Sequence, residues 1–166
     1  EQGCGFISTR DETGGRAQKK MPGGTLTAIS EKMARRIGND ISKTPSHFGD
    51  EGEGALWQAT KFVGQKINGV QKNLLLIQLY VPCPGEALHE HLSKVYGRDP
   101  IIMLIEQVAK LLTEQVTAGT GVVLSGDFNA DFTRKNDDAA RKKYKAEWKN
   151  KVLRPFSLEQ ENQGVE

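Results

Sequence analysis

A carboxylate and a carboxamide, two residues apart, follow a short apolar segment in the second half of the chain. The segment Val122-Val123-Leu124-Ser125 runs directly into Gly126-Asp127-Phe128-Asn129-Ala130-Asp131. If the segment is a strand, Asp127 and Asn129 point to the same side at its carboxyl end, where open α/β sheets bind ligands. Asp127 then accepts protons, and the Asn129 amide donates to a phosphate oxygen or holds water. The simpler interpretation is an Asx-rich turn that only ends the strand.

A calcium-binding loop is a further interpretation of this segment. Acidic and amide side chains stand at the ligand spacing of an EF-hand at Asp127, Asn129, Asp131 and Asp138. However, Phe132 stands where the EF-hand loop requires glycine, and an expected strand precedes the loop where an EF-hand has a helix. We therefore do not expect an EF-hand here.

Tyr80 is a second candidate for a role in chemistry. It lies near the end of the most apolar run of the chain, Leu74–Val81, and Pro82 follows that run. Such a run is typical of a strand buried on both faces. Tyr80 would then hold its ring in the sheet and its hydroxyl at the rim, within reach of a phosphate. The alternative is a core tyrosine whose hydroxyl bonds to the backbone, and the chemistry of this residue alone favours it.

The elements that must position these residues begin with strands. Alternating patterns predict strands over 25–29 and 56–63. The Asn68-Gly69 dipeptide, within the linker 64–73, predicts a hairpin turn before the strand 74–81. The sequence therefore predicts a hairpin whose second strand ends at Tyr80.

A helix is the clearest element between the two candidate sites. An apolar stripe at helical spacing predicts a helix that starts at Pro100, is capped by Asp99 and stops at Gly119. The order strand, loop, helix, strand predicts a crossover unit and an α/β fold. Weaker patterns predict three further elements, namely a strand at 4–7 and helices at 30–41 and 137–153.

Length and composition exclude several classes of protein. The 166 residues (18.3 kDa) correspond to one domain, with 37% hydrophobic and 27% charged residues. No apolar run approaches the roughly 18 residues of a membrane span. Two cysteines, Cys4 and Cys83, are too few for a disulfide scaffold, and we expect free thiols. The net charge of +2 does not by itself indicate a nucleic-acid binder.

The first residues carry no targeting signal. The chain begins Glu1-Gln2-Gly3, with neither an initiator methionine nor the apolar segment of a signal peptide. We therefore expect an intracellular protein with a truncated start. We also expect a monomer without membrane contact.

Basic residues gather toward the C-terminus. Between positions 134 and 151 there are eight basic and three acidic residues, with Tyr144 and Trp148 interleaved. A basic face near the Asp127 loop would suit the phosphates of a nucleic acid, with Arg141 and Lys145 in contact with substrate. The alternative, which we favour, is a solvated helix face whose two aromatic rings turn into the core.

The histidines are weaker candidates. His89 and His91 stand two apart after Pro84-Gly85, a spacing that could seat a metal on one face of a strand. No cysteine or acidic residue stands at ligand spacing from them, so we expect an exposed polar pair. We expect His47 to lie in a solvated loop.

Three motifs, in order between positions 22 and 131, resemble the endonuclease/exonuclease/phosphatase family. They are Pro22-Gly23-Gly24-Thr25-Leu26-Thr27-Ala28-Ile29, Leu79-Tyr80-Val81-Pro82 and Val123-Leu124-Ser125-Gly126-Asp127-Phe128-Asn129-Ala130-Asp131. The family also carries a helix where this chain has Asp99-Pro100. Gly-Asp-Phe-Asn after an apolar strand is the specific part of the match.

The resemblance implies a four-layer α/β sandwich that hydrolyses phosphodiester bonds with Mg²⁺, or Mn²⁺, as cofactor. Asp127 is similar to the family's aspartate that orients or deprotonates the attacking water and touches the metal. Asn129 is similar to the asparagine that holds the phosphate and joins metal binding. Tyr80 is similar to a strand-end tyrosine that contacts the scissile phosphate.

The resemblance also makes nucleic acid the favoured substrate and partner. One alternative is a phosphomonoesterase that acts on a small or lipid-derived phosphate. Another, from a different class, is a non-catalytic nucleic-acid-binding module that keeps the scaffold and the basic helix.

Two parts of the family's pattern are not found in this chain. The family has an early Asn and a metal-binding Glu upstream of the Gly-Gly strand, whereas Glu12 stands in Asp11-Glu12-Thr13-Gly14, which is typical of a loop. The family ends with a Ser-Asp-His strand, whereas no histidine follows His91. We therefore expect residues 1–166 to be a partial domain, with exposed sheet edges and little catalysis by the chain alone.

Overall fold

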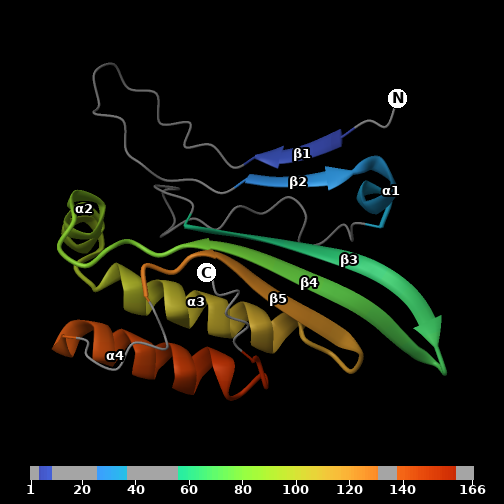
Figure 1. Ribbon diagram of the computed structural model, residues 1–166. Coiled ribbons are helices and arrows are strands. Elements are labelled where there is room, and N and C mark those ends of the chain that lie inside the picture. The colour runs from blue at the N-terminus through green and yellow to red at the C-terminus, as the bar shows by residue number, and fades with distance from the viewer. Residues whose placement is uncertain (1–3, 9–25, 37–55, 131–137, 160–166) are drawn as a thin grey trace, which may run out of the picture.

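A three-stranded sheet holds the strand-end candidates (Figure 1). The structure, a computed structural model, describes residues 4–8, 26–36, 56–130 and 138–159. In these residues the chain is mixed α/β, with helices against the three-stranded sheet and a separate two-stranded sheet. None of the helices in these ranges is long and apolar enough to cross a membrane.

The central sheet has the strand order β3-β4-β5. β3 (Trp57–Ile67) and β4 (Val70–Tyr80) form an antiparallel hairpin, and β5 (Thr120–Asp127) pairs with β4 in parallel. The chain crosses from β4 to β5 through α2 (Ala87–Tyr96) and α3 (Pro100–Gln115). The predicted crossover unit and the α/β class are confirmed.

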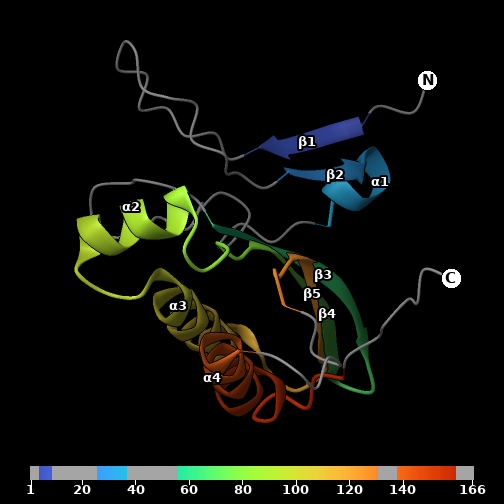
Figure 2. The same cartoon turned by 60° about the vertical axis from the view of Figure 1, so that its left-hand side comes forward.

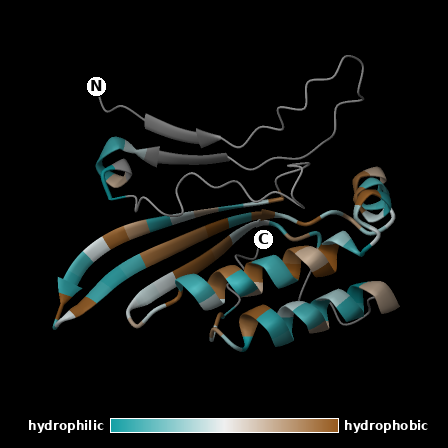
Figure 3. Cartoon of the chain, turned by 180° about the vertical axis from the view of Figure 1, so that it is seen from behind, coloured by the Kyte–Doolittle hydropathy of each residue, from teal (hydrophilic) through white to brown (hydrophobic). Residues whose placement is uncertain are grey.

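One face of the sheet packs against helices. The parallel register places Leu75 beside Val122 and Ile77 beside Leu124, so these side chains share a face. Figures 1 and 2 show α3 and α4 (Ala139–Trp148) on the same side of the sheet. In Figure 3 both helices alternate between hydrophobic and hydrophilic residues, as expected of helices with one buried side. The most deeply buried core residues are Leu75, Ile77, Leu79, Ile101, Leu104, Ile105, Val108, Leu112, Trp148 and Val152.

Asp99 joins α3 to α4. Its Oδ1 accepts hydrogen bonds from the backbone N–H groups of Ile101 (3.0 Å) and Ile102 (3.4 Å), which caps α3 as the sequence predicts. The Tyr144 hydroxyl on α4 donates to its Oδ2 at 2.9 Å, and Lys143 Nζ lies 3.7 Å from the same oxygen. One carboxylate therefore starts α3 and holds α4 against it.

The C-terminal helix changes its hydrogen-bond pattern without ending. α4 continues directly into a π-helical turn, η1 (Lys149–Leu153). Together they match the predicted helix over 137–153. Trp148 and Val152, four residues apart, are both buried in the core on this continuous helix.

A second sheet is formed by β1 (Cys4–Ser8) and β2 (Leu26–Ser30), which pair antiparallel, and α1 (Glu31–Ala34) follows. The strands predicted at 4–7 and 25–29 are confirmed in the described residues. The helix predicted over 30–41 is confirmed for α1, and positions 37–41 lie outside the described residues, as do the loop at 22–25 and His47.

The hairpin and α2 extend beyond what the sequence pattern predicts. The expected linker 64–73 pairs as strand on both sides of the turn, where Asn68 and Gly69 have φ of 49° and 79°. After Gly85 the sequence predicts only a loop or a helix start. A full helix forms there because Leu88 and Leu92, one turn apart, bury their side chains in the core.

Gly126 is required where β5 meets β4. Its φ is +132°, a conformation that other residues rarely adopt, and it pairs with Leu79 in the parallel register. A Cβ at this position would overlap the carbonyl oxygen of Leu79. Only glycine lets β5 approach β4 this closely one residue before Asp127.

Gly126→Ala is expected to lower the free energy of unfolding by about 3 kcal/mol or more, because it adds backbone strain and a clash with backbone. The measurement is urea unfolding followed by circular dichroism. The matched control is Gly121→Ala on the same strand, whose added Cβ would meet its nearest atoms at 3.7 and 3.8 Å and should change stability by less than about 1 kcal/mol. Equal losses in the two variants would contradict this role of Gly126.

Tyr144 is expected to make stability depend on alkaline pH. Burial, with the hydrogen bond and charge of Asp99, raises the pKa of Tyr144 to about 12 from 10.0. The folded state therefore prefers the neutral phenol, so this stabilisation is complete below pH 10 and is lost as the pH rises toward 12. Tyr144→Phe should cost about 1.5 kcal/mol at neutral pH, and its difference from the wild type should shrink above pH 10. A difference that stays constant across this range in chemical unfolding would contradict the assignment.

Candidate active site

The parallel pairing of β4 and β5 brings two of the expected site residues together. Tyr80 and Asp127 are direct partners in the register, each at the carboxyl end of its strand. The pairing continues one step further, where the Val81 N–H donates to the Asp127 carbonyl oxygen at 2.8 Å. The Asp127 side chain is exposed, and the Tyr80 side chain is half-buried. This edge of the sheet therefore offers a carboxylate and a phenol at the same level.

Asn129 turns back onto the end of β4. It adopts a left-handed conformation with φ of 46°, and its backbone N–H donates to Asp127 Oδ1 at 3.0 Å. Its Nδ2 donates to the Val81 carbonyl oxygen at 2.7 Å. The Asx turn of the simpler interpretation is thus present, and it fixes Asn129 beside Asp127. One amide hydrogen is used by Val81, and the structure records no partner for the other hydrogen or for Oδ1 among the residues it describes, so both can serve a ligand.

Phe128 anchors the loop from the side of the core. Its ring meets the Trp148 ring of α4 edge-on, with centroids 5.6 Å apart. Asp127 and Asn129 stand on either side of Phe128. They are therefore held in place by its aromatic contact with Trp148 and by the hydrogen bonds of Asn129. This contact explains why an aromatic residue stands between the two polar ones.

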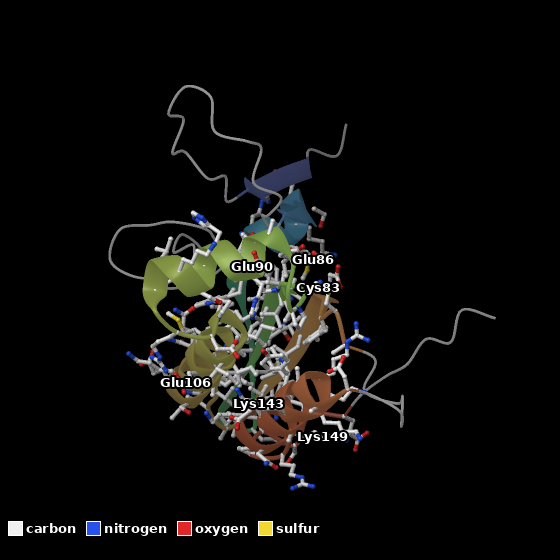
Figure 4. The ribbon with its side chains drawn as sticks, turned by 90° about the vertical axis from the view of Figure 1, so that its left-hand side faces the viewer. Cys83, Glu86, Glu90, Glu106, Lys143 and Lys149 are labelled. Carbon is white, nitrogen blue, oxygen red and sulfur yellow. The ribbon has the colours of Figure 1, made fainter. Side chains whose placement is uncertain are left out.

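Cys83 and Glu86 belong to the same site, although the sequence analysis assigns neither of them to it. The loop after β4 folds back through a hydrogen bond from the Glu86 N–H to the Cys83 carbonyl oxygen at 3.1 Å. The two side chains, labelled in Figure 4, also share a hydrogen bond. The available signal is their position, because Pro82-Cys83-Pro84-Gly85-Glu86 follows the carboxyl end of an α/β strand, where ligands bind.

The charges of the site act on Tyr80. Burial raises the pKa of Tyr80 above its usual 10.0, and the negative charge of Glu86, then that of Asp127, then Cys83, raise it further. The phenol therefore keeps its proton across the neutral range and acts as a hydrogen-bond donor. The Cys83 thiol is also held protonated, because burial and Glu86 raise its pKa more than Arg141 lowers it.

Arg141 brings the positive charge of α4 to this edge. Asp138 caps α4 by accepting from the Arg141 N–H at 2.8 Å, and the two side chains lie 3.7 Å apart. The positive charge of Arg141 opposes the rise in the Cys83 pKa, so α4 contributes to the electrostatics of the loop after β4. Lys145, the other expected substrate contact, is only 7% exposed one turn further along α4.

The remaining basic residues of α4 and η1 are exposed or form ion pairs, and Lys143 does both. Lys142, Lys143 and Lys149 are exposed, and Figure 4 shows Lys143 and Lys149 on this helix below the site. Lys151 pairs with Glu147 at 3.0 Å and with Glu106 at 3.4 Å. Tyr144 and Trp148 point into the core, as the favoured interpretation of this helix expects.

Few of the described side chains at this site could bind a metal ion. Within the described ranges no group of three or more His, Cys, Asp or Glu side chains could hold a metal ion. The Asp127 carboxylate and the Asn129 amide oxygen remain as two neighbouring donors. His89 and His91 lie on α2, where His89 Nε2 is 3.8 Å from Asp99 Oδ1. Of the EF-hand positions, Asp138 caps α4, and Asp131 lies outside the described residues.

Comparisons with known proteins do not assign this chain to a family. No protein-family model matches the chain. The comparison with curated proteins and the comparison with solved structures also find no match. The resemblance to the endonuclease/exonuclease/phosphatase family therefore depends on the three sequence motifs alone.

Glu86→Gln is expected to lower the Tyr80 pKa toward 10 without reaching it, because one negative neighbour is removed while burial persists. The measurement is the ultraviolet absorbance of tyrosinate against pH, with Tyr80→Phe used to assign the transition. Glu90→Gln, one turn further along α2, is the matched control, since Glu90 is not among the groups that act on Tyr80. A Tyr80 pKa at or below 10 in the wild type would contradict the geometry of the site.

Proposed function

We propose that this chain is the phosphate-binding part of a four-layer α/β sandwich of the endonuclease/exonuclease/phosphatase type. Its function is the hydrolysis of phosphodiester bonds, with nucleic acid as substrate and Mg²⁺ or Mn²⁺ as cofactor. The observation that carries the proposal is the meeting of Tyr80, Asp127 and Asn129 at the carboxyl ends of two parallel strands. Hydrolysis of a phosphoester needs a group that accepts a proton from water and groups that donate hydrogen bonds to the phosphate. The carboxylate can do the first, and the neutral phenol and the amide can do the second.

The charge of the site supports a requirement for a divalent cation. Among the residues that the structure describes, Asp127 and Glu86 contribute two carboxylates, and Arg141 contributes a guanidinium, to the charges that act on this site. A phosphodiester is itself an anion, so these carboxylates would repel it. Asp127 and Asn129 are the described residues that would hold the cation, and Mg²⁺ commonly binds through one or two protein groups plus water and substrate phosphate. The cation would supply charge neutralisation at the phosphate.

The side chains of the site divide the remaining steps. Asp127 orients a water molecule and accepts its proton as the water oxygen bonds to phosphorus and the bond to the leaving oxygen breaks, and the leaving oxygen takes a proton from solvent. The protonated phenol of Tyr80 and the second amide hydrogen of Asn129 donate to phosphate oxygens where negative charge develops. Arg141 faces the same phosphate from α4 and limits its diffusion away from the site.

A non-catalytic nucleic-acid-binding module is the second candidate function. It is favoured by the exposed Lys142, Lys143 and Lys149 on the helix that also carries Arg141. Phosphates bind such a surface without any contribution from Asp127. The two functions therefore differ in the effect of removing Asp127.

The wild-type chain is expected to cleave plasmid DNA or single-stranded RNA only slowly in Mg²⁺ or Mn²⁺, and Asp127→Asn and Asn129→Ala are each expected to slow this cleavage further, by about 100-fold or more. Asp127→Asn removes the group that accepts the proton of water, and Asn129→Ala removes the amide that donates to the phosphate. The measurement is the rate of strand cleavage by the purified chain, with and without chelator. The control is Glu114→Gln on the far end of α3, whose carboxylate pairs with Lys110 and should not affect the rate.

The outcomes separate the two candidate functions. Cleavage that depends on both the metal and Asp127 supports the hydrolase. Salt-dependent nucleic-acid binding that survives Asp127→Asn, with no cleavage in either metal, supports the binding module instead. If the chain neither binds nor cleaves nucleic acid, both proposals are wrong.

A further inference from the structure

The β3–β4 hairpin extends past the rest of the central sheet. β5 begins its pairing where Asn73 meets Thr120, whereas β4 starts at Val70 and β3 continues to Ile67. Residues 64–72 therefore form a two-stranded arm with no third strand beside it in the described residues. Figure 1 shows this arm projecting beyond β5 and beyond the ends of α3 and α4.

Several local features give the arm a defined shape. The Asn68-Gly69 turn closes it, and a bulge between Val63 and Lys66 bends β3. At this bulge the Gln71 side chain donates to the Gly64 carbonyl oxygen. A Cβ on Gly64 would overlap the Lys72 carbonyl oxygen, so the two strands are as close as glycine allows. An isolated two-stranded ribbon is only marginally stable in water. The turn, the bulge and the Gln71 hydrogen bond supply the additional constraints that hold the two strands of the arm together.

The charged side chains of the arm are all basic. From Trp57 to Tyr80 the hairpin contains three lysines and no acidic residue. Lys66 and Lys72 are exposed, and the structure records no ion pair for either of them in the described residues. At the tip, Ile67 is 51% exposed and pairs with Val70, which is 36% exposed. The arm is therefore a cationic ribbon with an apolar tip.

We propose that this arm, residues 64–72, is a docking surface for a nucleic-acid duplex. The inference rests on the proposed function for its choice of polyanion. The major groove admits a two-stranded β-ribbon, so the arm has a shape that a duplex accepts. Lys66 and Lys72 contact phosphates, while Ile67 and Val70 contact the apolar edges of bases or sugars. Charge complementarity selects a polyanion over a neutral protein partner.

The arm is separate from the candidate active site. Tyr80 is ten residues further along β4 than Val70, a distance of about 33 Å along an extended strand. The arm therefore contacts a part of the duplex about one helical turn away from the phosphate held near Asp127. Lysines on a free hairpin also discourage pairing with a second copy of the chain, and that purely protective role is the alternative to be tested.

The test uses the full chain with Asp127→Asn, so that cleavage does not consume the probe. Fluorescence anisotropy measures the affinity for a 20-base-pair DNA duplex, a length of roughly two helical turns, across a series of salt concentrations. The double variant Lys66→Gln/Lys72→Gln should reduce the slope of log affinity against log salt by about 1.8, since each lost phosphate contact contributes about 0.9. Ile67→Ser should weaken binding a few-fold without changing this slope, because the lost contact is apolar.

The matched control is Lys110→Gln, an exposed lysine on α3 that should leave the slope unchanged. A double variant that behaves like Lys110→Gln overturns the arm proposal, as does self-association of the double variant with unchanged DNA affinity. Cleavage by the wild type is measured separately in Mg²⁺. If the wild type cleaves DNA but the arm variants do not change DNA binding, only the arm proposal is refuted. If DNA binding depends on the arm but the wild type does not cleave DNA, only the hydrolase proposal is refuted.

Discussion

The parallel pairing of β4 with β5 is the constraint on which the rest of the site depends. It sets Tyr80 opposite Asp127, although 46 residues separate them in the sequence. Because Gly126 sits against the Leu79 backbone, the pairing holds until the last residue of β5. The Asn129 amide then extends the contact past the strand ends to Val81. Backbone geometry, more than any side-chain contact, thus determines where the polar groups meet.

A second set of contacts supports this edge from the helical layer. Asp99 caps α3 and receives the Tyr144 hydroxyl of α4, so the two helices keep a fixed relation. Trp148 on α4 packs against Phe128, between the two polar residues of the loop. The same helix carries Arg141, whose positive charge opposes the rise in the Cys83 pKa in the loop after β4. The packing that stabilises the core therefore also supplies the positive charge of the site.

The two ends of the central sheet differ in chemistry. In the described part of the chain, the carboxyl end collects carboxylates, a neutral phenol and the guanidinium of Arg141, and under the proposed function a cation offsets the negative charge of the carboxylates. The opposite end carries lysines and exposed apolar residues, and the hairpin from Trp57 to Tyr80 contains no acidic residue. A long polyanion could use both ends, one for chemistry and one for affinity, whereas a small phosphoester could use only the first.

Local pattern was enough to predict the Asp99 cap, the turn at Asn68-Gly69 and the polar pair after β5, because each depends on neighbours within a few residues. The order of the predicted elements was enough to predict the crossover unit. The full length of the hairpin depends on pairing between its two strands, and the extent of α2 depends on the burial of Leu88 and Leu92, so neither could be predicted in this way. Cys83 and Glu86 joined the site only in the tertiary structure, because their effect on Tyr80 requires strands and loops distant in sequence to meet. The sequence by itself determined the residue types that could bind a phosphate, and tertiary pairing decided which of them share a charge environment.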